Sequence, residues 1–218
     1  MIELEEVTYA EGKTLVFDRV SYQIRPGTIH CLSGKNSVGK STFLRLITHH
    51  IAPQSGTLRF FHYVLKSLDL SQLALHRQQI GWITQQARFL EELTVQENLE
   101  LFARIRGKAT VEIAPLLQTV AEQLDIAPYL ALPIHEVSPG IRQLVQVGRV
   151  LIQRPLLILA DEPTQFLGKD LIKKIQKLLF ELSQNWDVTT LVTTTWPEFW
   201  GSSHFQHCKI ENHQIISS

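Results

Sequence analysis

Gly34-Lys35-Asn36-Ser37-Val38-Gly39-Lys40-Ser41-Thr42 is the stretch that decides the fold of this chain. It matches the phosphate-loop pattern G-x-x-x-x-G-K-[ST], which needs a strand before it and a helix after it. Residues 27–33 follow a Pro26-Gly27 turn and are typical of a strand, while residues 42–47 carry apolar side chains at helical spacing. Both flanks fit, so the sequence predicts a nucleoside-triphosphate site rather than a chance match.

The residue types of this loop suit a polyphosphate and its metal ion. Backbone N–H groups of the loop can converge on phosphate oxygens, and the Lys40 ammonium can reach the β and γ oxygens. The Ser41 hydroxyl can ligate Mg²⁺ at the N-terminus of the following helix. The predicted nucleotide contacts in this loop are Gly34, Lys35, Asn36, Ser37, Val38, Gly39, Lys40, Ser41 and Thr42.

A second group of candidate residues follows the apolar run at residues 156–160. That run is typical of a buried parallel strand, and Asp161 and Glu162 come directly after it. Because ligands bind at the carboxyl ends of parallel strands, we expect both carboxylates at the same sheet edge as the phosphate loop. Asp161 would hold Mg²⁺ through water, and Glu162 would polarise an attacking water molecule. The alternative is a solvated strand end, which the pairing with Lys40 disfavours.

Composition sets looser bounds on the class of protein. The chain has 218 residues, 44% of them hydrophobic, and a formal net charge of zero, which favours one compact soluble domain or one domain with a sub-lobe. The balanced charge argues against a dominant nucleic-acid surface. Cys31 and Cys208 lie outside any C-x-x-C pair, which predicts reduced, buried thiols in a cytosolic protein. The longest apolar runs are too short to span a bilayer, so a membrane role has to come through another chain.

The order of apolar patterns predicts an α/β core interrupted by helices. Residues 1–24 alternate as an antiparallel sheet would, with a turn at Gly12 and Lys13. Thr94 and Glu97 form the pattern of a capping box, which opens a helix that stops near Gly107. A second helix follows and ends before Pro128. Further strands are predicted at 56–60, 80–84, 156–160 and 188–193, and further helices at 139–153 and 169–183.

With these motifs in this order, the chain resembles the nucleotide-binding subunit of an ABC transporter over nearly its whole length. Residues 77–85 followed by 93–99 resemble the segment that ends in the family's Q-loop glutamine, here Gln85. The stretch from residue 137 to residue 164 is most similar to the FtsE-like and lipoprotein-releasing (LolD/MacB-like) subfamily. Those relatives are short subunits that dock onto separate membrane proteins.

The resemblance implies the fold and the ligands. It implies an α/β P-loop NTPase of ABC type, in which a mixed sheet core is flanked by helices and joined by an N-terminal antiparallel β-subdomain. One nucleotide-binding domain would span residues 1–218, with a helical subdomain inserted at about residues 88–140. The implied cofactors are ATP and Mg²⁺.

The resemblance also implies roles for individual residues. Catalysis would fall to Glu162, Lys40 and Gln85, and Mg²⁺ would be held by Ser41, Gln85 and Asp161. The nucleotide contacts beyond the phosphate loop would be Gln85, Asp161, Ser138 and Gly140, the last two reaching across a dimer interface.

The implied partners are proteins rather than nucleic acid. They are a second nucleotide-binding subunit, in a homodimer or heterodimer, and a separate transmembrane subunit. The chain would then be cytoplasmic and peripheral on the inner face of the membrane. Residues 85–92 and the first inserted helix would form the docking site for a cytoplasmic helix of the transmembrane subunit, with Phe89 and Leu90 exposed. The alternative is that Phe89 packs beneath the inserted helices.

One departure from the family pattern concerns the signature loop, where Val137-Ser138-Pro139-Gly140-Ile141 replaces Leu-Ser-Gly-Gly-Gln. Ser138 as N-cap with Pro139 at the first helical position is a sound helix start. However, proline removes one backbone N–H that would otherwise face the γ-phosphate of the other subunit's ATP.

Other departures lie nearer the nucleotide. The family's switch histidine aligns with Thr194 or Thr195, of which we favour Thr195, and its D-loop aspartate aligns with Gly168. Ser37 stands where the loop usually has its middle glycine. The aromatic residue that stacks on adenine aligns nearest Glu11, with Tyr9 as the candidate substitute. These changes are either tolerated variation or a cause of slow hydrolysis.

Three functions therefore stay open. The first is an ATPase subunit that moves a membrane partner in transport or in an FtsE-like role in cell division. The second is a degenerate regulatory or scaffold subunit that binds ATP and hydrolyses it slowly or only with a partner. The third is a soluble, non-transport P-loop ATPase.

Overall fold

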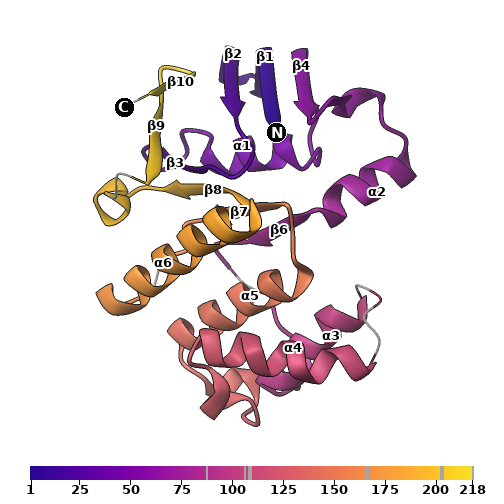
Figure 1. Ribbon diagram of the computed structural model, residues 1–218. Helices are drawn as coiled ribbons and strands as arrows, with labels where there is room; N and C mark the ends of the chain where they lie inside the picture. Colours follow the sequence, from indigo (N-terminus) through magenta and orange to yellow (C-terminus); the bar gives the residue numbers. More distant parts are fainter. Residues whose placement is uncertain (87, 106, 108–109, 165–166, 202–203, 218) are drawn as a thin grey trace.

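The computed structural model of the protein describes residues 1–86, 88–105, 107, 110–164, 167–201 and 204–217. Within these ranges the strands form a four-stranded and a six-stranded sheet, and a group of helices lies away from both (Figure 1). None of the described helices is long and apolar enough to cross a membrane. The architecture is the predicted α/β class with a mixed sheet core flanked by helices.

The N-terminal sheet is antiparallel, as the sequence predicts. Its strand order is β2-β1-β4-β5, and Gly12 turns the β1–β2 hairpin with a φ of 62°. Ile2, Leu4 and Val7 of β1 are buried on one face of this sheet. The strands are β1 (Ile2–Glu11), β2 (Thr14–Ile24), β4 (Ser55–Phe60) and β5 (Tyr63–Val64).

The central sheet is parallel except for its last strand. Its order is β10-β9-β3-β8-β7-β6, and only β9 and β10 pair antiparallel. β3, β7 and β8 are buried at every residue, because both faces of the sheet are covered. The strands are β3 (Ile29–Ser33), β6 (Ile80–Ile83), β7 (Leu157–Asp161), β8 (Thr189–Thr194), β9 (Phe205–Glu211) and β10 (Gln214–Ser217).

Separate apolar cores lie on the two faces of this sheet. α1 (Lys40–Ile47) packs between one face and the N-terminal sheet, where Phe43 and Leu46 meet Leu4 and Leu159. α6 (Lys169–Trp186) and α5 (Pro139–Gln153) pack on the other face, which holds Cys31. Cys208 belongs to the first core, so both cysteines are buried, as predicted.

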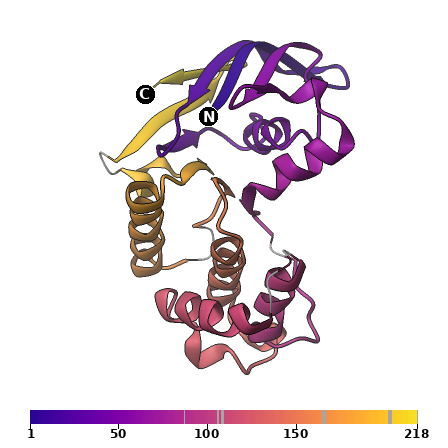
Figure 2. The same ribbon diagram turned by 45° about the vertical axis from the view of Figure 1, so that its right-hand side comes forward.

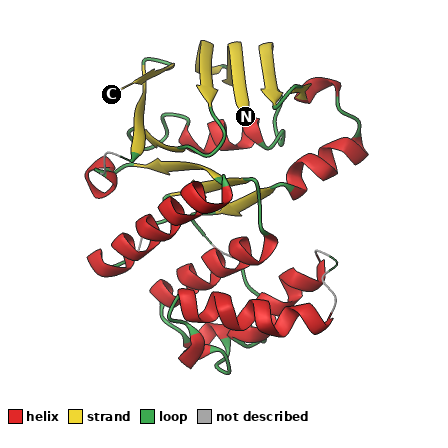
Figure 3. Ribbon diagram, in the orientation of Figure 1, coloured by secondary structure: helices red, strands yellow, loops and turns green. Residues whose placement is uncertain are grey.

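A group of helices that excludes α2 (Leu70–Gln78) forms a lobe below the sheet in Figures 2 and 3, and α5 joins this lobe to the sheet. The lobe contains α3 (Val95–Ile105), α4 (Thr110–Gln123) and the short turns η2 (Ala127–Tyr129) and η3 (Ile134–Glu136). The predicted capping box is confirmed, since Thr94 N–H donates to Glu97 Oε2 at 2.8 Å and Glu97 N–H donates to Thr94 Oγ1 at 3.1 Å. Subdomain boundaries at residues 88–140 stay a prediction.

Besides the two-residue strand β5 and the short helical turns, the sequence did not predict α2, β9 or β10. α2 lacks an apolar stripe, because Leu70 and Leu75 face solvent. It is started by a capping box in which Gln72 N–H donates to Asp69 Oδ1 at 2.8 Å, while Asp69 N–H donates to Gln72 Oε1 at 2.9 Å. β9 and β10 follow the last strand that the sequence predicted. β9 pairs in parallel with β3, on the side of β3 that faces away from β8. Two further short turns are η1 (Leu65–Ser67), which precedes α2, and η4 (Pro197–Trp200), which follows β8.

Candidate active site

The phosphate loop lies at the carboxyl edge of the central sheet. β3 leads into it at Ser33 and α1 leaves it at Lys40. Gly34 N–H donates to the carbonyl of Thr194 at 3.2 Å, which ties the loop to the end of β8. This is the strand–loop–helix context that the motif requires.

The loop backbone is shaped by two residues with positive φ. Ser37 has a φ of 61° and Gly39 a φ of 113°. A Cβ atom on Gly39 would lie 2.6 Å from Val16 Cγ1, so this position needs glycine for space as well as for conformation. Ser37 adopts a left-handed conformation that favours glycine, which agrees with its place in the motif. Alternating backbone conformations of this kind make anion-binding concavities.

We expect Gly39→Ala to lower the unfolding free energy by about 2 kcal/mol or more, since it adds strain and a clash at a forced φ. Gly168→Ala is the matched control, because Gly168 has a φ of −73° and a Cβ there meets nothing within 4 Å. Denaturant unfolding of both variants checks this. Equal losses in the two variants would contradict the requirement for glycine at Gly39.

The Lys40 side chain is held by the backbone of the phosphate loop. Its side chain is nearly buried, and its Nζ donates to the carbonyls of Gly34 at 2.8 Å and Lys35 at 3.1 Å. The same Nζ lies 3.5 Å from Glu162 Oε1. The ammonium is therefore positioned at the mouth of the loop with donors that phosphate oxygens can accept in place of the carbonyls.

The candidate magnesium ligands meet beside it. Ser41 Oγ donates to Asp161 Oδ2 at 2.6 Å, although the two residues are far apart in the sequence. Thr193 Oγ1 donates to Asp161 Oδ1 at 2.6 Å and fixes the carboxylate from the other side. A hydroxyl and a carboxylate are the hard oxygen donors that Mg²⁺ takes in proteins, so these residues fit that ion.

Glu162 combines burial with a neighbouring cation. Its backbone has a φ of 49° and its N–H donates to the carbonyl of Thr193 at 3.0 Å. Burial raises the pKa of the Glu162 carboxyl above its usual range, and the attraction of Lys40 and a backbone hydrogen bond from Thr195 oppose part of that shift. A half-buried carboxylate with a raised pKa is suited to accept a proton from water.

These residues share one pocket of about 690 Å³. Its wall includes the phosphate loop, the first residues of α1, Gln85 and both carboxylates, which the sequence placed together. The predicted site residues that line it are Asn36, Ser37, Gly39, Lys40, Ser41, Thr42, Gln85, Asp161 and Glu162.

The remaining predicted contacts lie elsewhere. Gly34, Lys35 and Val38 belong to the loop but are not among the residues that line this pocket. Ser138 and Gly140 lie at the start of α5, where Ser138 Oγ accepts from Ile141 N–H at 3.3 Å and confirms the predicted N-cap. Pro139 and Gln85 both line a neighbouring pocket, so Gln85 lies between the pocket of the phosphate loop and the start of α5.

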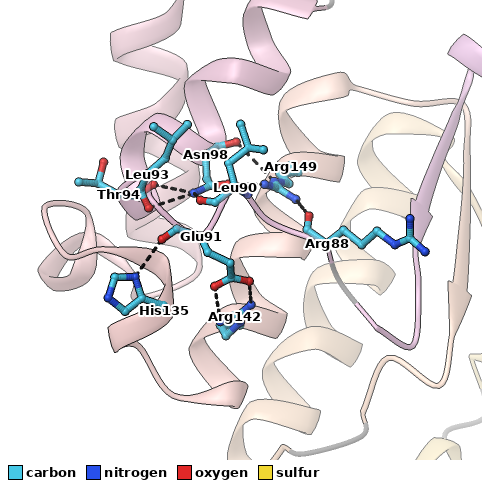
Figure 4. A network of polar contacts seen from close by, with 9 residues as sticks. All are labelled: Arg88, Leu90, Glu91, Leu93, Thr94, Asn98, His135, Arg142 and Arg149. Atoms are coloured by element: carbon cyan, nitrogen blue, oxygen red, sulfur yellow. Dashed lines mark hydrogen bonds and ion pairs between the residues drawn. The ribbon is translucent and has the colours of Figure 1, made fainter.

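A polar network that the sequence did not predict links residues 88–98 to α5 (Figure 4). Arg149 of α5 is only 5% exposed, and its guanidinium donates to Asn98 Oδ1 and to the carbonyl of Arg88, each at 2.6 Å. Burial lowers the pKa of Arg149 to about 10. The ring centroids of Phe89 and Phe102 lie 4.3 Å and 4.5 Å from its guanidinium carbon. The network joins α3, α5 and the segment after Gln85.

The prediction that Phe89 is exposed is wrong. It is half-buried and packs against the apolar core, and the guanidinium carbons of Arg142 and Arg149 lie 5.1 Å and 4.3 Å from its ring centroid, so the alternative of packing beneath the insert is confirmed. Leu90 is 52% exposed, as expected. Arg142 also pairs with the carboxylate of Glu91, with one N–H donating at 2.9 Å (Figure 4).

Comparison with known proteins agrees with this geometry. A family model described as "ABC transporter" matches residues 17–165. The chain belongs to the ABC transporter family. Its curated relatives in this family include the lipoprotein-releasing system ATP-binding protein LolD of Buchnera aphidicola, 32% identical over 81% of this chain and 78% of the relative. They also include the cell division ATP-binding protein FtsE of Mycobacterium tuberculosis, 31% identical over 89% of this chain and 85% of the relative.

Solved ABC cassettes share the fold over almost the whole chain. The dimeric structure of MJ0796, a bacterial ABC transporter cassette, is 25% identical, covers 99% of this chain and 96% of its own, and gives a TM-score of 0.87. A second dimeric structure of that cassette, in a post-hydrolysis state bound to ADP and Pi, gives a TM-score of 0.86. The predicted resemblance and fold class are therefore confirmed.

The departures from the ABC pattern fall at defined places. Thr194 is a buried strand end whose Oγ1 accepts from Trp196 N–H at 3.0 Å, whereas Thr195 is half-buried and hydrogen-bonds Glu162. Gly168 is the N-cap of α6 and makes no side-chain cap. Glu11, rather than Tyr9, lines the pocket of the phosphate loop, and Tyr9 packs against the core.

Proposed function

We propose that this chain binds ATP and Mg²⁺ in the pocket of the phosphate loop and hydrolyses the γ-phosphate bond as one subunit of a membrane-protein complex. The observation that carries the proposal is the convergence of Lys40, Ser41, Asp161 and Glu162 within hydrogen-bond or ion-pair distance at one sheet edge. A chance phosphate-loop pattern would not be expected to lie beside the carboxylates of Asp161, at the end of β7, and of Glu162, directly after it.

The roles follow from the chemistry of each group. Lys40 would bind the β and γ oxygens in place of the loop carbonyls, and the loop N–H groups would bind the same phosphates. Ser41, Asp161 and Gln85 would hold Mg²⁺, which supplies charge neutralisation at the phosphates when bound. Glu162 would orient a water molecule and accept its proton.

The position of the start of α5 and the names of the relatives support the proposed partners. Ser138 and Gly140 lie outside the pocket of their own chain, so they are free to contact the nucleotide of a second subunit in a homodimer or heterodimer. Residues 88–140 would form the helical subdomain that moves with this contact. The LolD and FtsE names of the relatives support a separate transmembrane partner and a place on the inner face of the membrane.

A regulatory role is the second candidate. The absence of a histidine at Thr195, of an aspartate at Gly168 and of an N–H at Pro139 removes groups that the family uses on the transition state. Loss of one preorganised contact typically slows a reaction about 10²- to 10³-fold. Hydrolysis would then be slow, or depend on a stronger partner subunit, while ATP binding persists. A soluble ATPase without a membrane partner is disfavoured by the transporter and cell-division relatives.

The proposal is tested by measuring the rate of phosphate release from ATP. The rate is measured with and without the membrane protein that copurifies with this chain from native membranes. We expect ATP binding in the isolated chain and turnover that rises when the membrane partner is present. Tight ATP binding with equally slow turnover in both preparations would favour the regulatory role. The failure of any membrane protein to copurify would favour the soluble ATPase.

Restoring the missing histidine should raise turnover. We expect Thr195→His to accelerate hydrolysis by at least ~10-fold, equivalent to ~1.4 kcal/mol of barrier, because it restores the family's switch histidine at a residue whose backbone N–H already bonds Glu162. Trp196→His is the matched control, since Trp196 is exposed and one residue further from that carboxylate. Phosphate release at saturating ATP checks this. A wild-type rate that is already fast and unmoved by Thr195→His would mean that threonine is tolerated here.

A further inference from the structure

Two side chains of α5 hold the backbone on either side of Gln85. Before it, Gln146 Nε2 donates to Thr84 Oγ1 at 2.8 Å. After it, Arg149 donates to the carbonyl of Arg88 (Figure 4). Because Gln146 and Arg149 are three residues apart in a helix, they lie on the same side of it. The segment that carries Gln85 is therefore anchored to one helix at two points.

The hydroxyl of Thr84 also closes the turn around Gln85. It accepts the bond from Gln146 and donates its own proton to the carbonyl of Gln86 at 3.0 Å. One hydroxyl thus ties together the residues before and after Gln85 and joins them to α5. Gln85 and Asp161 both line the pocket of the phosphate loop, so the orientation of this backbone determines whether the Gln85 side chain can reach a metal ion beside Asp161.

Gln146 is an unfavourable residue for its place in the helix. It is 6% exposed, and its neighbours Val145, Val147 and Val150 are buried apolar residues. Its Oε1 is buried and has no hydrogen-bond partner among the described residues. A buried polar atom without a partner destabilises a fold, whereas an apolar side chain of similar size avoids that loss. Stability therefore does not account for an amide here, and its bond to Thr84 does.

We propose that Gln146 is a positioning residue, which acts through Thr84 to hold Gln85 in the orientation that binds Mg²⁺. The inference rests on the proposed function, because it uses the Mg²⁺ site assigned to Ser41, Asp161 and Gln85. Ser41 and Asp161 are positioned by other hydrogen bonds. Loss of the Gln146 amide therefore weakens the Mg²⁺-dependent part of ATP binding and leaves the Mg²⁺-free part unchanged.

Calorimetric titration of the full chain with ATP, in Mg²⁺ and in EDTA, tests this. The ratio of the two dissociation constants reports the gain in affinity that Mg²⁺ gives. Gln146→Leu should reduce that gain about tenfold, which is at the lower end of the effect of losing a group that orients a metal ligand. Its affinity for ATP in EDTA should match that of the wild type, because the phosphate loop and Lys40 are untouched.

The stability of Gln146→Leu without nucleotide separates positioning from a structural role. The midpoint of its urea unfolding should equal or exceed that of the wild type, because the variant removes an unpaired buried oxygen. An amide that serves the fold would give a lower midpoint instead.

Further variants test whether Gln146 acts through Thr84 and Gln85. Thr84→Ser keeps the hydroxyl and should keep the wild-type gain, whereas Thr84→Val removes it and should behave like Gln146→Leu. In a Gln85→Ala background, Gln146→Leu should change the gain no further. Gln153→Leu is the matched control, because Gln153 lies about two helical turns further along α5 and lines the same pocket of about 660 Å³ as Gln146. It should keep the wild-type gain.

The outcomes are distinguishable. A wild-type gain that Gln146→Leu leaves unchanged, or lowers equally in the Gln85→Ala background, overturns the role of Gln146 alone. A lower urea midpoint together with weaker ATP binding in EDTA shows a structural role and overturns it as well. A wild type that binds no ATP, or gains no affinity from Mg²⁺, overturns the proposed function and this inference with it.

Discussion

The Lys40→Ala variant is expected to lose all nucleotide-dependent thermal stabilisation and to keep its fold. In the protein, Lys40 donates to the carbonyls of Gly34 and Lys35 and lies 3.5 Å from Glu162. Alanine removes the side-chain ammonium that would bind the phosphate oxygens in the loop. A ligand at about 100 times its dissociation constant stabilises a protein by roughly 2.7 kcal/mol, which is the shift that should vanish.

Lys35→Ala is the matched control, because Lys35 lies in the same loop but its side chain is exposed. It should retain most of the shift with Mg²⁺ and ATP. Melting curves without nucleotide report whether either variant is destabilised by itself, since Lys40→Ala leaves Glu162 without a neighbouring cation. If Lys40→Ala keeps the full wild-type shift with nucleotide, the assignment of the phosphate loop is wrong.

The sequence predicted the core of the site because its groups sit in motifs with a fixed structural context. Ser41 and Asp161 are 120 residues apart, yet they meet at 2.6 Å because two parallel strands end at the same edge. The capping box at Thr94 and the N-cap at Ser138 were predicted for a similar reason, since local hydrogen bonds define them. In each case a few neighbouring residues determine the local structure.

Other features depend on contacts that no local pattern encodes. The acidic, polar segment around Phe89 predicts an exposed side chain, but the guanidinium groups of Arg142 and Arg149 from α5 lie over its ring. The position of those guanidinium groups follows from the packing of α5 against α3. Asn98 and Arg149 are 51 residues apart in the sequence, and no motif predicts their hydrogen bond. α2 was missed because its apolar residues do not share one face.

The Glu162→Gln variant is expected to lose about 10²- to 10⁴-fold in turnover while its ATP affinity changes little. Glutamine keeps the size of the side chain and removes the base. Burial raises the pKa of Glu162, and a base acts only when ionised, so wild-type turnover should fall with acid at a higher pH than an ordinary glutamate would give. The residual activity of Glu162→Gln should lack this acid limb.

Phosphate release between pH 5 and 9, with saturating ATP and the membrane partner present, separates the outcomes. Glu198→Gln is the control, because Glu198 is an exposed glutamate just beyond β8. If the wild type is fast and Glu162→Gln is equally fast, the base lies elsewhere. If the wild type is already as slow as Glu162→Gln while both bind ATP tightly, the groups missing at Thr195, Gly168 and Pro139 limit the reaction before proton transfer does. The chain then acts through nucleotide binding, because Lys40, Ser41 and Asp161 are sufficient for binding without a competent base.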